Sequence, residues 1–363
     1  MTDKMEGEVP QVIRVGSRKS ELALIQTNAV IERLQKLYPD QKFEVVTMET
    51  IGDAIQDKPL SNIGISSLFT KELERALADD KIDMIVHSLK DLPSVLPDGM
   101  VIATVCTRDD PHDALVLSPK HAGRTLETLP PGSVVGTSSV RRVAQLKRNF
   151  PHLEFKDVRG NLNTRLRKLD EGSQNYACLI LAAAGLHRMA WDHRISQVLR
   201  PDVCMYSPCQ GAMAVECKLD ARSLVRFLSR LHDPATLLQC VCERALLRTL
   251  QGGCSAPVAV DSQVEDGKIR LTGAAFSLDG SECVQETQSA DLPPDSLQKK
   301  EPSEGADAFR HYSFIVAPNL SHGALHAAEQ LGSTVATVML GDGADKILEA
   351  AKQEIEARRN KTD

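Results

Sequence analysis

The chain has 363 residues, which is more than one hydrophobic core usually serves, so two or three domains are expected. Aromatic residues make up only 4% of it, which predicts aliphatic cores and few platforms for stacking nucleic-acid bases. The net charge of -6 also disfavours a general polyanion binder, because such domains are usually basic.

Short apolar runs alternate with amphipathic segments through the first half of the chain. This alternation is typical of an α/β fold with mostly parallel sheets. Apolar side chains spaced three or four residues apart identify the helices. In chain order we expect a strand at 12–15, a helix at 21–37, a strand at 43–48, a helix at 68–78, strands at 84–86, 101–105, 114–117 and 134–135, a helix at 140–149, a strand at 153–158, a helix at 162–170 and a strand at 177–181.

The pattern changes after Cys217 and predicts a third, smaller α+β domain. Asp266 and Gly267 give a strong hairpin signal between two strands. Residues from about 289 to 308 are rich in Pro, Ser, Asp, Glu and Lys, which predicts a mobile surface insertion. The other elements expected here are a helix at 234–250, strands at 258–264 and 268–276, and helices at 323–331 and 344–357.

The sequence also disfavours several other classes of protein. No apolar run approaches the roughly 20 residues that cross a bilayer. The polar, acidic N-terminus through Val9 resembles neither a signal peptide nor a transit peptide, so a cytosolic protein is expected. Nine cysteines without framework-like spacing favour reduced thiols, and none has the spacing of a zinc site, so no metal is expected.

Arginines stand at predicted helix starts in two similar segments, 15–20 (Val-Gly-Ser-Arg-Lys-Ser) and 135–142 (Val-Gly-Thr-Ser-Ser-Val-Arg-Arg). Aligned peptide dipoles make a cation in the first helical turn unfavourable by about 0.3 to 1 kcal/mol. We therefore expect Arg141 and Arg142 to meet a bound carboxylate or phosphate. For any single arginine, a solvated surface charge is the simpler interpretation. The other arginines at strand ends or helix starts are Arg14, Arg18, Arg159, Arg165 and Arg188.

Residues 87–93, His-Ser-Leu-Lys-Asp-Leu-Pro, follow a predicted buried strand, and Pro93 forces a turn. Polar groups at such strand ends are often catalytic in α/β enzymes. A carboxylate at Asp91, flanked by cations, can move protons or stabilise a developing cation. A loop ion pair between Lys90 and Asp91 explains the same residues equally well.

Cys254 follows two glycines at the end of the predicted helix 234–250. Glycines allow positive φ and close backbone approach, so the thiol can be held out on a loop. Because a helix C-terminus does not favour a thiolate, a covalent attachment point fits better than a resting nucleophile. Most cysteines are small buried apolar residues, and that interpretation stays open here.

Six ordered segments of the chain together closely resemble the porphobilinogen deaminase family, also called hydroxymethylbilane synthases. They are 87–93, 136–142, 159–165, 210–212 (Gln-Gly-Ala), 243–245 (Glu-Arg-Ala) and 252–254 (Gly-Gly-Cys). The resemblance runs from about Val12 to the C-terminus. The chain looks like the animal form, because of the insertion after Phe276 and the segment 68–74.

The resemblance implies a fold of two periplasmic-binding-protein-like (type II) α/β domains plus a smaller α+β C-terminal domain. It places domain 1 at 1–108 with 208–231, domain 2 at 109–207 and domain 3 at 232–363. It implies a transferase that joins four porphobilinogen molecules head to tail, with loss of ammonia, to hydroxymethylbilane for tetrapyrrole and haem synthesis. A cytoplasmic monomer acting on this small molecule, without nucleic-acid or membrane partners, is expected.

The resemblance also implies the site. Asp91 is expected to be the catalytic carboxylate, and a dipyrromethane cofactor made from substrate is expected to be joined through a thioether to Cys254. The residues expected to hold this cofactor are Ser88, Lys90, Thr137, Ser138, Ser139, Arg141, Arg142, Arg165 and Arg188. Those expected to bind substrate are Arg14, Arg18, Gln26, Arg159 and Gln210.

Three residues depart from the family pattern. Asn62 and Ser66 stand where lysines are usual in a loop expected to cover the cleft, which predicts a weaker hold on the growing chain by about 1 to 3 kcal/mol. Cys209 replaces a usual glycine, and it costs stability if the position needs positive φ. These departures make a variant of impaired activity one alternative.

Two other protein classes are alternatives. A non-enzymatic anion receptor of the periplasmic-binding type would share the arginines, but it would lack the domain with Cys254 and would normally carry a secretion signal. A nucleic-acid-binding regulator is disfavoured by the acidic charge and the sparse aromatics.

Overall fold

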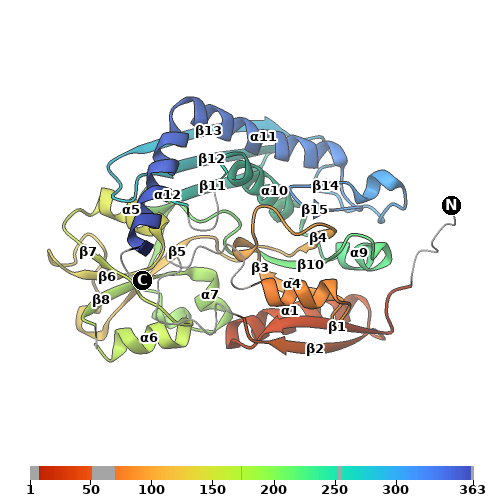
Figure 1. The fold of residues 1–363 in the computed structure, drawn as a ribbon, viewed down its shortest axis with the longest axis horizontal. Helices are drawn as coiled ribbons and strands as arrows, with labels where there is room; N and C mark the ends of the chain where they lie inside the picture. The colour runs from red at the N-terminus through yellow and green to blue at the C-terminus, as the bar shows by residue number, and fades with distance from the viewer. Residues whose placement is uncertain (1–7, 51–69, 173, 252–255, 361–363) are drawn as a thin grey trace.

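The structure is a computed structural model that describes residues 8–50, 70–172, 174–251 and 256–360 (Figure 1). The strands of these residues form three sheets of seven, five and three strands. The expected combination of two α/β units with a smaller α+β unit is confirmed. Figure 1 shows the three-stranded sheet above the two larger ones, which lie side by side.

The seven-stranded sheet has the order β14-β15-β4-β10-β3-β1-β2. Its strands are β1 (Val12–Arg18), β2 (Lys42–Met48), β3 (Met84–Ser88), β4 (Met100–Val105), β10 (Met213–Lys218), β14 (His311–Tyr312) and β15 (Ile315–Val316). β1 is parallel to both β2 and β3, whereas β10 lies antiparallel between β3 and β4. After forming the second sheet, the chain therefore returns to add β10 to the middle of the first one.

The five-stranded sheet has the order β7-β6-β8-β5-β9. Its strands are β5 (Asp113–Leu117), β6 (Val134–Gly136), β7 (Glu154–Lys156), β8 (Tyr176–Ala182) and β9 (Gln197–Leu199). β6 is parallel to β7 and β8, but β5 is antiparallel to β8 and β9. The expectation of mostly parallel sheets is thus wrong. Both large sheets are mixed, because β5 and β10 lie antiparallel to the strands on either side of them.

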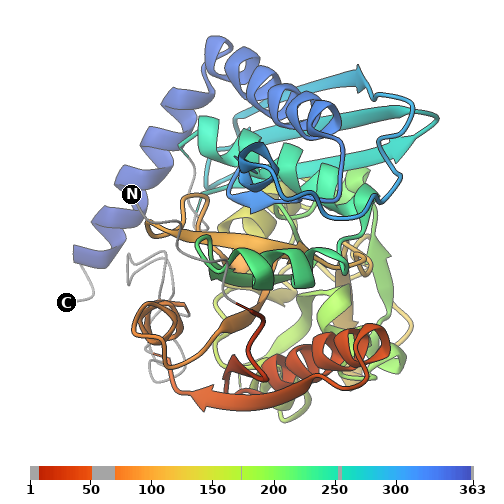
Figure 2. The same cartoon turned by 90° about the vertical axis from the view of Figure 1, so that its right-hand side faces the viewer.

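The three-stranded sheet is antiparallel and consists of β11 (Val258–Glu265), β12 (Lys268–Phe276) and β13 (Cys283–Asp291). The hairpin predicted at Asp266 and Gly267 is confirmed, with both residues at positive φ. Two helices, α10 (Pro234–Thr249) and α11 (His322–Gly341), pack together on this sheet, and α12 (Ala344–Asn360) follows them (Figure 2).

The helices of the two larger units are mostly those predicted from apolar periodicity. α1 (Glu21–Leu37), α5 (Val140–Asn149) and α6 (Leu162–Asp170) have the predicted limits. Local caps help to fix such ends: the Asn161 side chain accepts from the Thr164 amide at the start of α6. In the part of the chain that the structure describes, these units also contain the α-helices α4 (Lys71–Ala78), α7 (Ala183–Arg188), α8 (Pro201–Cys204) and α9 (Arg222–Ser229). The 3-10 turns are η1 (Leu89–Asp91), η2 (Pro119–His121), η3 (Asp192–Arg194) and η4 (Ala306–Phe309).

The prediction of a mobile surface insertion at 289–308 is wrong at both ends of this range. Residues 289–291 complete β13, and Ala308 and Phe309 are buried in the core of the first sheet. β13 escaped the sequence analysis because six of its nine side chains are polar and none is fully buried, which leaves no apolar period.

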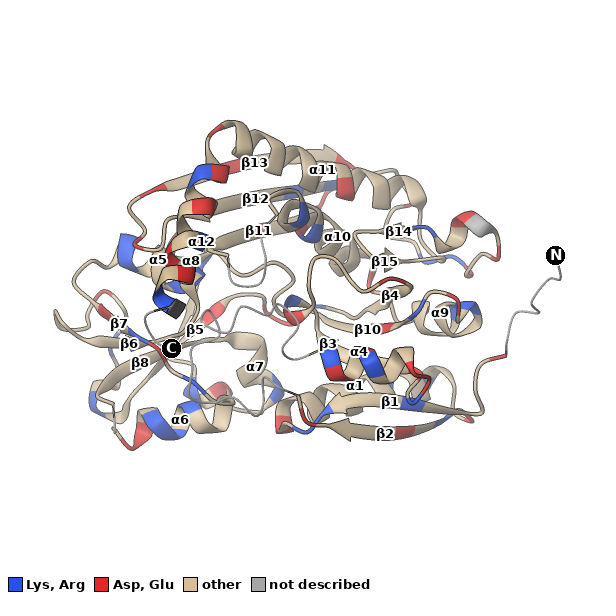
Figure 3. Cartoon of the chain, in the orientation of Figure 1, with Lys and Arg blue, Asp and Glu red and all other residues tan. Residues whose placement is uncertain are grey.

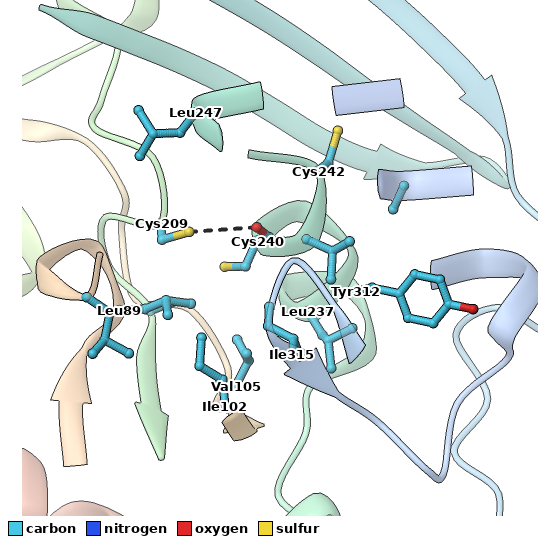
Figure 4. Packing of buried hydrophobic residues seen from close by; sticks show 14 of the residues in the cluster. Leu89, Ile102, Val105, Cys209, Leu237, Cys240, Cys242, Leu247, Tyr312 and Ile315 are labelled. Atoms are coloured by element: carbon cyan, nitrogen blue, oxygen red, sulfur yellow. Dashed lines mark hydrogen bonds between the residues drawn. The ribbon is translucent and has the colours of Figure 1, made fainter. Parts of the chain in front are cut away.

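The largest apolar cluster joins the first sheet to the third unit. Leu89 and Ile102 come from the first unit, Leu237 and Cys240 from α10, and Ile315 from β15 (Figure 4). Since this interface is as deeply buried as a domain core, we infer that α10 is held firmly against the first sheet. None of the helices in the described part of the chain is long and apolar enough to span a bilayer.

Cys209, which stands where the family usually has glycine, has a φ of +63° and is buried. A Cβ atom in this conformation clashes with the following carbonyl, so the condition under which Cys209 costs stability is met. Its Sγ lies 3.8 Å from the carbonyl oxygen of Cys240 (Figure 4). Any test must therefore separate backbone strain from loss of the sulfur.

A pair of variants makes that separation. Cys209→Gly and Cys209→Ala both remove the sulfur, but only glycine removes the strain. We expect the free energy of unfolding of Cys209→Gly to exceed that of Cys209→Ala by about 1 kcal/mol. Urea unfolding curves measure this difference. Equal stabilities would show that the positive φ at position 209 costs nothing.

Candidate active site

A cavity of about 630 Å³ lies where the first and second units meet. Seven Lys or Arg residues and three Asp or Glu residues contribute to its lining. It is therefore cationic in a chain whose net charge is -6. Basic and acidic residues otherwise intermingle along the ribbon (Figure 3), so the positive excess is local to this site. Such a cavity attracts anions.

The loop predicted to be catalytic lies at this cavity. Ser88 ends β3, and Lys90 and Asp91 belong to the turn η1 that follows; all three line the cavity. Lys90 Nζ donates to Gln210 Oε1 at 3.1 Å. Burial lowers the pKa of Lys90 to about 8, and the nearby Asp91 carboxylate opposes that shift. Asp91 is partly exposed in the cavity, where its carboxylate can meet a ligand.

Four of the predicted arginines on the second unit reach the same cavity: Arg142, Arg159, Arg165 and Arg188. Burial lowers the pKa of Arg165 to about 10, and the neighbouring guanidinium groups of Arg142 and Arg159 add to this effect. The Nε atoms of Arg142 and Arg159 are buried and have no hydrogen-bond partner. Because an unpaired buried donor is costly, these two atoms are suited to a bound acceptor.

Arg18 lines the cavity from the end of β1, and Arg188 is held at its edge. Arg188 Nε donates to Asp109 Oδ2 at 2.8 Å, and its Nη2 donates to the carbonyl oxygen of Gly211 at 2.6 Å. Gly211 has a φ of +89°, and a Cβ atom there would lie 2.5 Å from the Asp109 carbonyl oxygen. The glycine is thus required for the backbone to pass Asp109 and present its carbonyl to Arg188.

Arg141 does not line the cavity. It is buried, with Nη1 lying 2.8 Å from Asp113 Oδ2 and donating to the Met205 carbonyl at 2.6 Å. Arg142 Nη2 donates to Asp113 Oδ1 at 2.6 Å. The expectation that the arginine pair requires a bound anion is therefore wrong, because Asp113 supplies a negative charge from within the protein. One carboxylate for two guanidinium groups still leaves the cavity side of Arg142 cationic.

Arg14 also lies outside the cavity, contrary to its predicted substrate-binding role. Its guanidinium pairs with Asp83, with Nη2 to Oδ1 at 2.6 Å and Nε to Oδ2 at 3.0 Å. Its Nη1 donates to the carbonyl oxygen of Asp80. Arg14 sits near the start of β1, so it faces the opposite end of the strand from Arg18.

The hydroxyl residues before α5 make local hydrogen bonds and do not line the cavity. Ser138 Oγ donates to the carbonyl of Val158 and accepts from its amide. Thr137 Oγ1 accepts from the amide of Ser139. These contacts shape the turn into α5. The Thr137 and Ser138 hydroxyls thus have a structural role that the sequence analysis did not anticipate, and Ser139 takes part through its backbone amide.

Two predicted glutamines lie just behind the lining. Gln26 Nε2 donates to Ser88 Oγ at 2.8 Å, and so it orients a hydroxyl that does reach the cavity. Gln210 accepts from Lys90 and donates to Asp113 Oδ1 at 2.8 Å. Asp113 itself was missed by the sequence analysis; the available signal was a lone carboxylate opening an otherwise apolar strand.

Three residues of the sequence analysis, Cys254, Asn62 and Ser66, lie outside the described residues. α10 ends just before the cysteine segment, and Gln251 has a φ of +53°. Among the described residues, no group of three or more His, Cys, Asp or Glu side chains is placed to hold a metal ion.

Comparison with known proteins places this site in a family. The sequence model of the porphobilinogen deaminase dipyromethane cofactor binding domain matches residues 13–226, and the model of the C-terminal domain matches residues 237–304. The porphobilinogen deaminase of Synechococcus elongatus is 50% identical over 277 residues, which cover 76% of this chain and 86% of that protein. That of Yarrowia lipolytica is 42% identical over 350 residues, covering 95% and 94%.

Among solved structures, the methionine binding protein MetQ matches with a TM-score of 0.38 and 13% identity, covering 61% of this chain and 91% of that one. The sequence matches are far closer and extend over the cavity-lining residues of both large units. The chain therefore belongs to the porphobilinogen deaminase family of transferases, whose cofactor is dipyrromethane.

Proposed function

We propose that the chain joins four porphobilinogen molecules head to tail, with release of ammonia, to give hydroxymethylbilane in tetrapyrrole and haem synthesis. The observation that carries the proposal is the cationic cavity, in which Arg142 and Arg159 each hold a buried Nε without a partner. Porphobilinogen carries an acetate and a propionate side chain, and carboxylates are the acceptors that guanidinium groups bind best.

The residues present fit a dipyrromethane cofactor, because its four carboxylates match a cavity lined by seven basic residues. When bound, the cofactor supplies the terminal pyrrole carbon to which the first substrate unit is joined. We propose that the side chains of the cofactor are bound by Arg142, Arg165, Arg188, Lys90 and Ser88. The incoming substrate is bound by Arg18 and Arg159. Arg141 and Gln210 support these groups from behind.

Asp91 is proposed as the catalytic carboxylate. Loss of ammonia from the aminomethyl group of porphobilinogen leaves a cation that is delocalised over the pyrrole ring. The Asp91 carboxylate, which lines the cavity beside Lys90, can stabilise that cation and hold a proton of the pyrrole nitrogen. The surrounding walls of the two units limit the access of water, which would otherwise compete with the pyrrole ring for the cation.

The intact mass of the purified protein tests the cofactor assignment. We expect a mass above that of the sequence by one dipyrromethane unit, because Cys254 is proposed to carry it through a thioether. Cys254→Ser should have the mass of the unmodified chain and no turnover, while Cys283→Ser, which changes a half-buried cysteine in β13, should keep the adduct. Active wild-type protein of unmodified mass would contradict the proposal.

An anion receptor is the second candidate function, since the cavity would serve one equally well. The third unit argues for the enzyme, because α10 leads from the core directly into the segment that contains Cys254. Turnover of porphobilinogen, assayed as hydroxymethylbilane formed, separates the two functions.

We also propose that the chain is of the animal type and acts as a cytoplasmic monomer without nucleic-acid or membrane partners. The long match with a fungal relative, which extends through residues beyond the cyanobacterial matches, supports a eukaryotic origin. The domain limits 1–108 with 208–231, 109–207 and 232–363 are proposed with one qualification: β14 and β15 of the third segment add to the first sheet.

A further inference from the structure

Asp113 lies behind the cavity without lining it, at the first position of β5, and its side chain is 0% exposed. Its Oδ1 accepts from Arg142 Nη2 at 2.6 Å and from Gln210 Nε2 at 2.8 Å. Its Oδ2 lies 2.8 Å from Arg141 Nη1. Burial alone would raise the pKa of Asp113, but the two arginines outweigh it and hold that pKa well below its usual range. The two guanidinium groups therefore favour the charged form of this carboxylate.

The contact with Arg142 fixes how that guanidinium faces the cavity. Arg142 Nη2 is held by Asp113, and Nη1 donates to the carbonyl oxygen of Ile180 at 2.8 Å. Two anchors set the plane of a rigid, flat group. These two bonds use two of the five N–H groups of the guanidinium, and Arg142 lines the cavity. Asp113 thus determines the orientation in which the Arg142 guanidinium faces the cavity.

The contact with Gln210 fixes a second cation. Gln210 Nε2 donates to Asp113 Oδ1 and to the carbonyl oxygen of Pro111 at 2.7 Å, so both of its protons are used. This orientation turns Oε1 toward Lys90 Nζ, 3.1 Å away. Lys90 belongs to the first unit and Arg142 to the second, so one carboxylate aligns basic groups from both walls of the cavity.

We propose that Asp113 is a positioning residue for the polymerisation reaction, orienting Arg142 directly and Lys90 through Gln210 toward the carboxylates of the bound pyrroles. This inference rests on the proposed function. It assigns to Asp113 no contact with the ligand and no proton transfer. Its consequence is that removing the charge changes the binding of substrate in a protein that still folds.

The variant Asp113→Asn keeps the shape of the side chain and one oxygen acceptor but removes the charge. We expect the KM for porphobilinogen to rise about tenfold or more, as for a weakened hydrogen bond to a charged group. The alkaline limb of the pH profile should move to lower pH, because the Asp113 carboxylate raises the pKa of Lys90.

Asp83→Asn is the matched control. Asp83 also binds an arginine through both of its oxygens, but that arginine, Arg14, lies outside the cavity. We expect the control to keep the wild-type KM and pH profile. A purely structural role for Asp113 would lower the Tm of its variant and leave both kinetic readouts where they are.

The outcomes separate this inference from the proposed function. Wild-type protein without turnover or dipyrromethane would contradict the function, whatever the variants do. An active wild type with Asp113→Asn of unchanged KM and pH profile would contradict only the positioning role. If Asp113→Asn does not fold, Gln210→Leu decides: it removes the contact that orients Lys90 while Asp113 keeps its arginines, and an unchanged KM for porphobilinogen would overturn the proposal.

Discussion

Replacement of Asp91 by alanine is expected to lower kcat by about 10²- to 10⁴-fold, the range associated with loss of a positioned acid or base. Asp91 lines the cavity next to Lys90 and lies in the turn η1 that ends β3. Its removal leaves the ammonia-releasing step without the carboxylate that we propose stabilises the developing cation. The measurement is the initial rate of hydroxymethylbilane formation at saturating porphobilinogen.

The same experiment needs evidence that the variant is folded. Because Asp91 is partly exposed, its loss should leave the far-UV circular dichroism spectrum and Tm near those of the wild type. Asp98→Ala is the matched control, since Asp98 is an exposed aspartate in the loop that follows. A rate for Asp91→Ala within a few fold of that control would remove the catalytic role.

Substitution of Glu243 by glutamine is expected to destabilise the protein by about 3 to 5 kcal/mol, as when one partner of a buried ion pair is removed. Glu243 is 0% exposed and lies in α10. It accepts from Arg108 Nη1 at 2.7 Å, from the Cys209 amide at 2.5 Å and from Ser262 Oγ at 2.6 Å. The substitution leaves the Arg108 charge buried without its counterion.

Glu243 also links the third unit to Arg108 and Cys209, near the two points where the chain passes between the first and second units, so its effect should extend to the site. Arg108 precedes β5, Cys209 precedes Gln210 and Ser262 belongs to β11. We expect a Tm several degrees below that of the wild type, measured by differential scanning calorimetry. Glu354→Gln breaks an exposed pair with Arg358 in α12 and should cost no more than about 0.5 kcal/mol. Similar Tm values for the two variants would show that the buried pair adds nothing.

Local patterns predicted much of the fold. α1, α5 and α6 have their predicted limits because a helix is defined by apolar periodicity and by caps within a few residues. The strand directions could not be obtained in this way. β5 and β10 lie antiparallel to neighbours that are distant in the chain, and their own residues carry no signal of the partner they join.

The candidate site, like the fold, was predicted only in part from local patterns. The loop 87–93 and the arginines that follow β6 and precede α6 were identified from residue type and turn position, and Asp91, Arg142, Arg159 and Arg165 do line one cavity. Arg14 and Arg141 have equivalent sequence signals but bind internal carboxylates. Arg14 pairs with Asp83, which is 69 residues away in the chain, and Arg141 pairs with Asp113. Because these partners are distant in the chain, no local pattern distinguishes a ligand-binding arginine from a structural one.

The sequence by itself determined the family, the polar loop 87–93 and the cationic character of the strand-to-helix junctions, because these depend on residue identity and short-range geometry. Only the tertiary structure decided which cations face the cavity. That choice depends on where buried carboxylates such as Asp113 lie, since a guanidinium pairs with the nearest anion that folding brings to it. The arginines that open α5 are thus divided: Arg141 pairs with Asp113 away from the cavity, and Arg142, which shares that carboxylate, lines it.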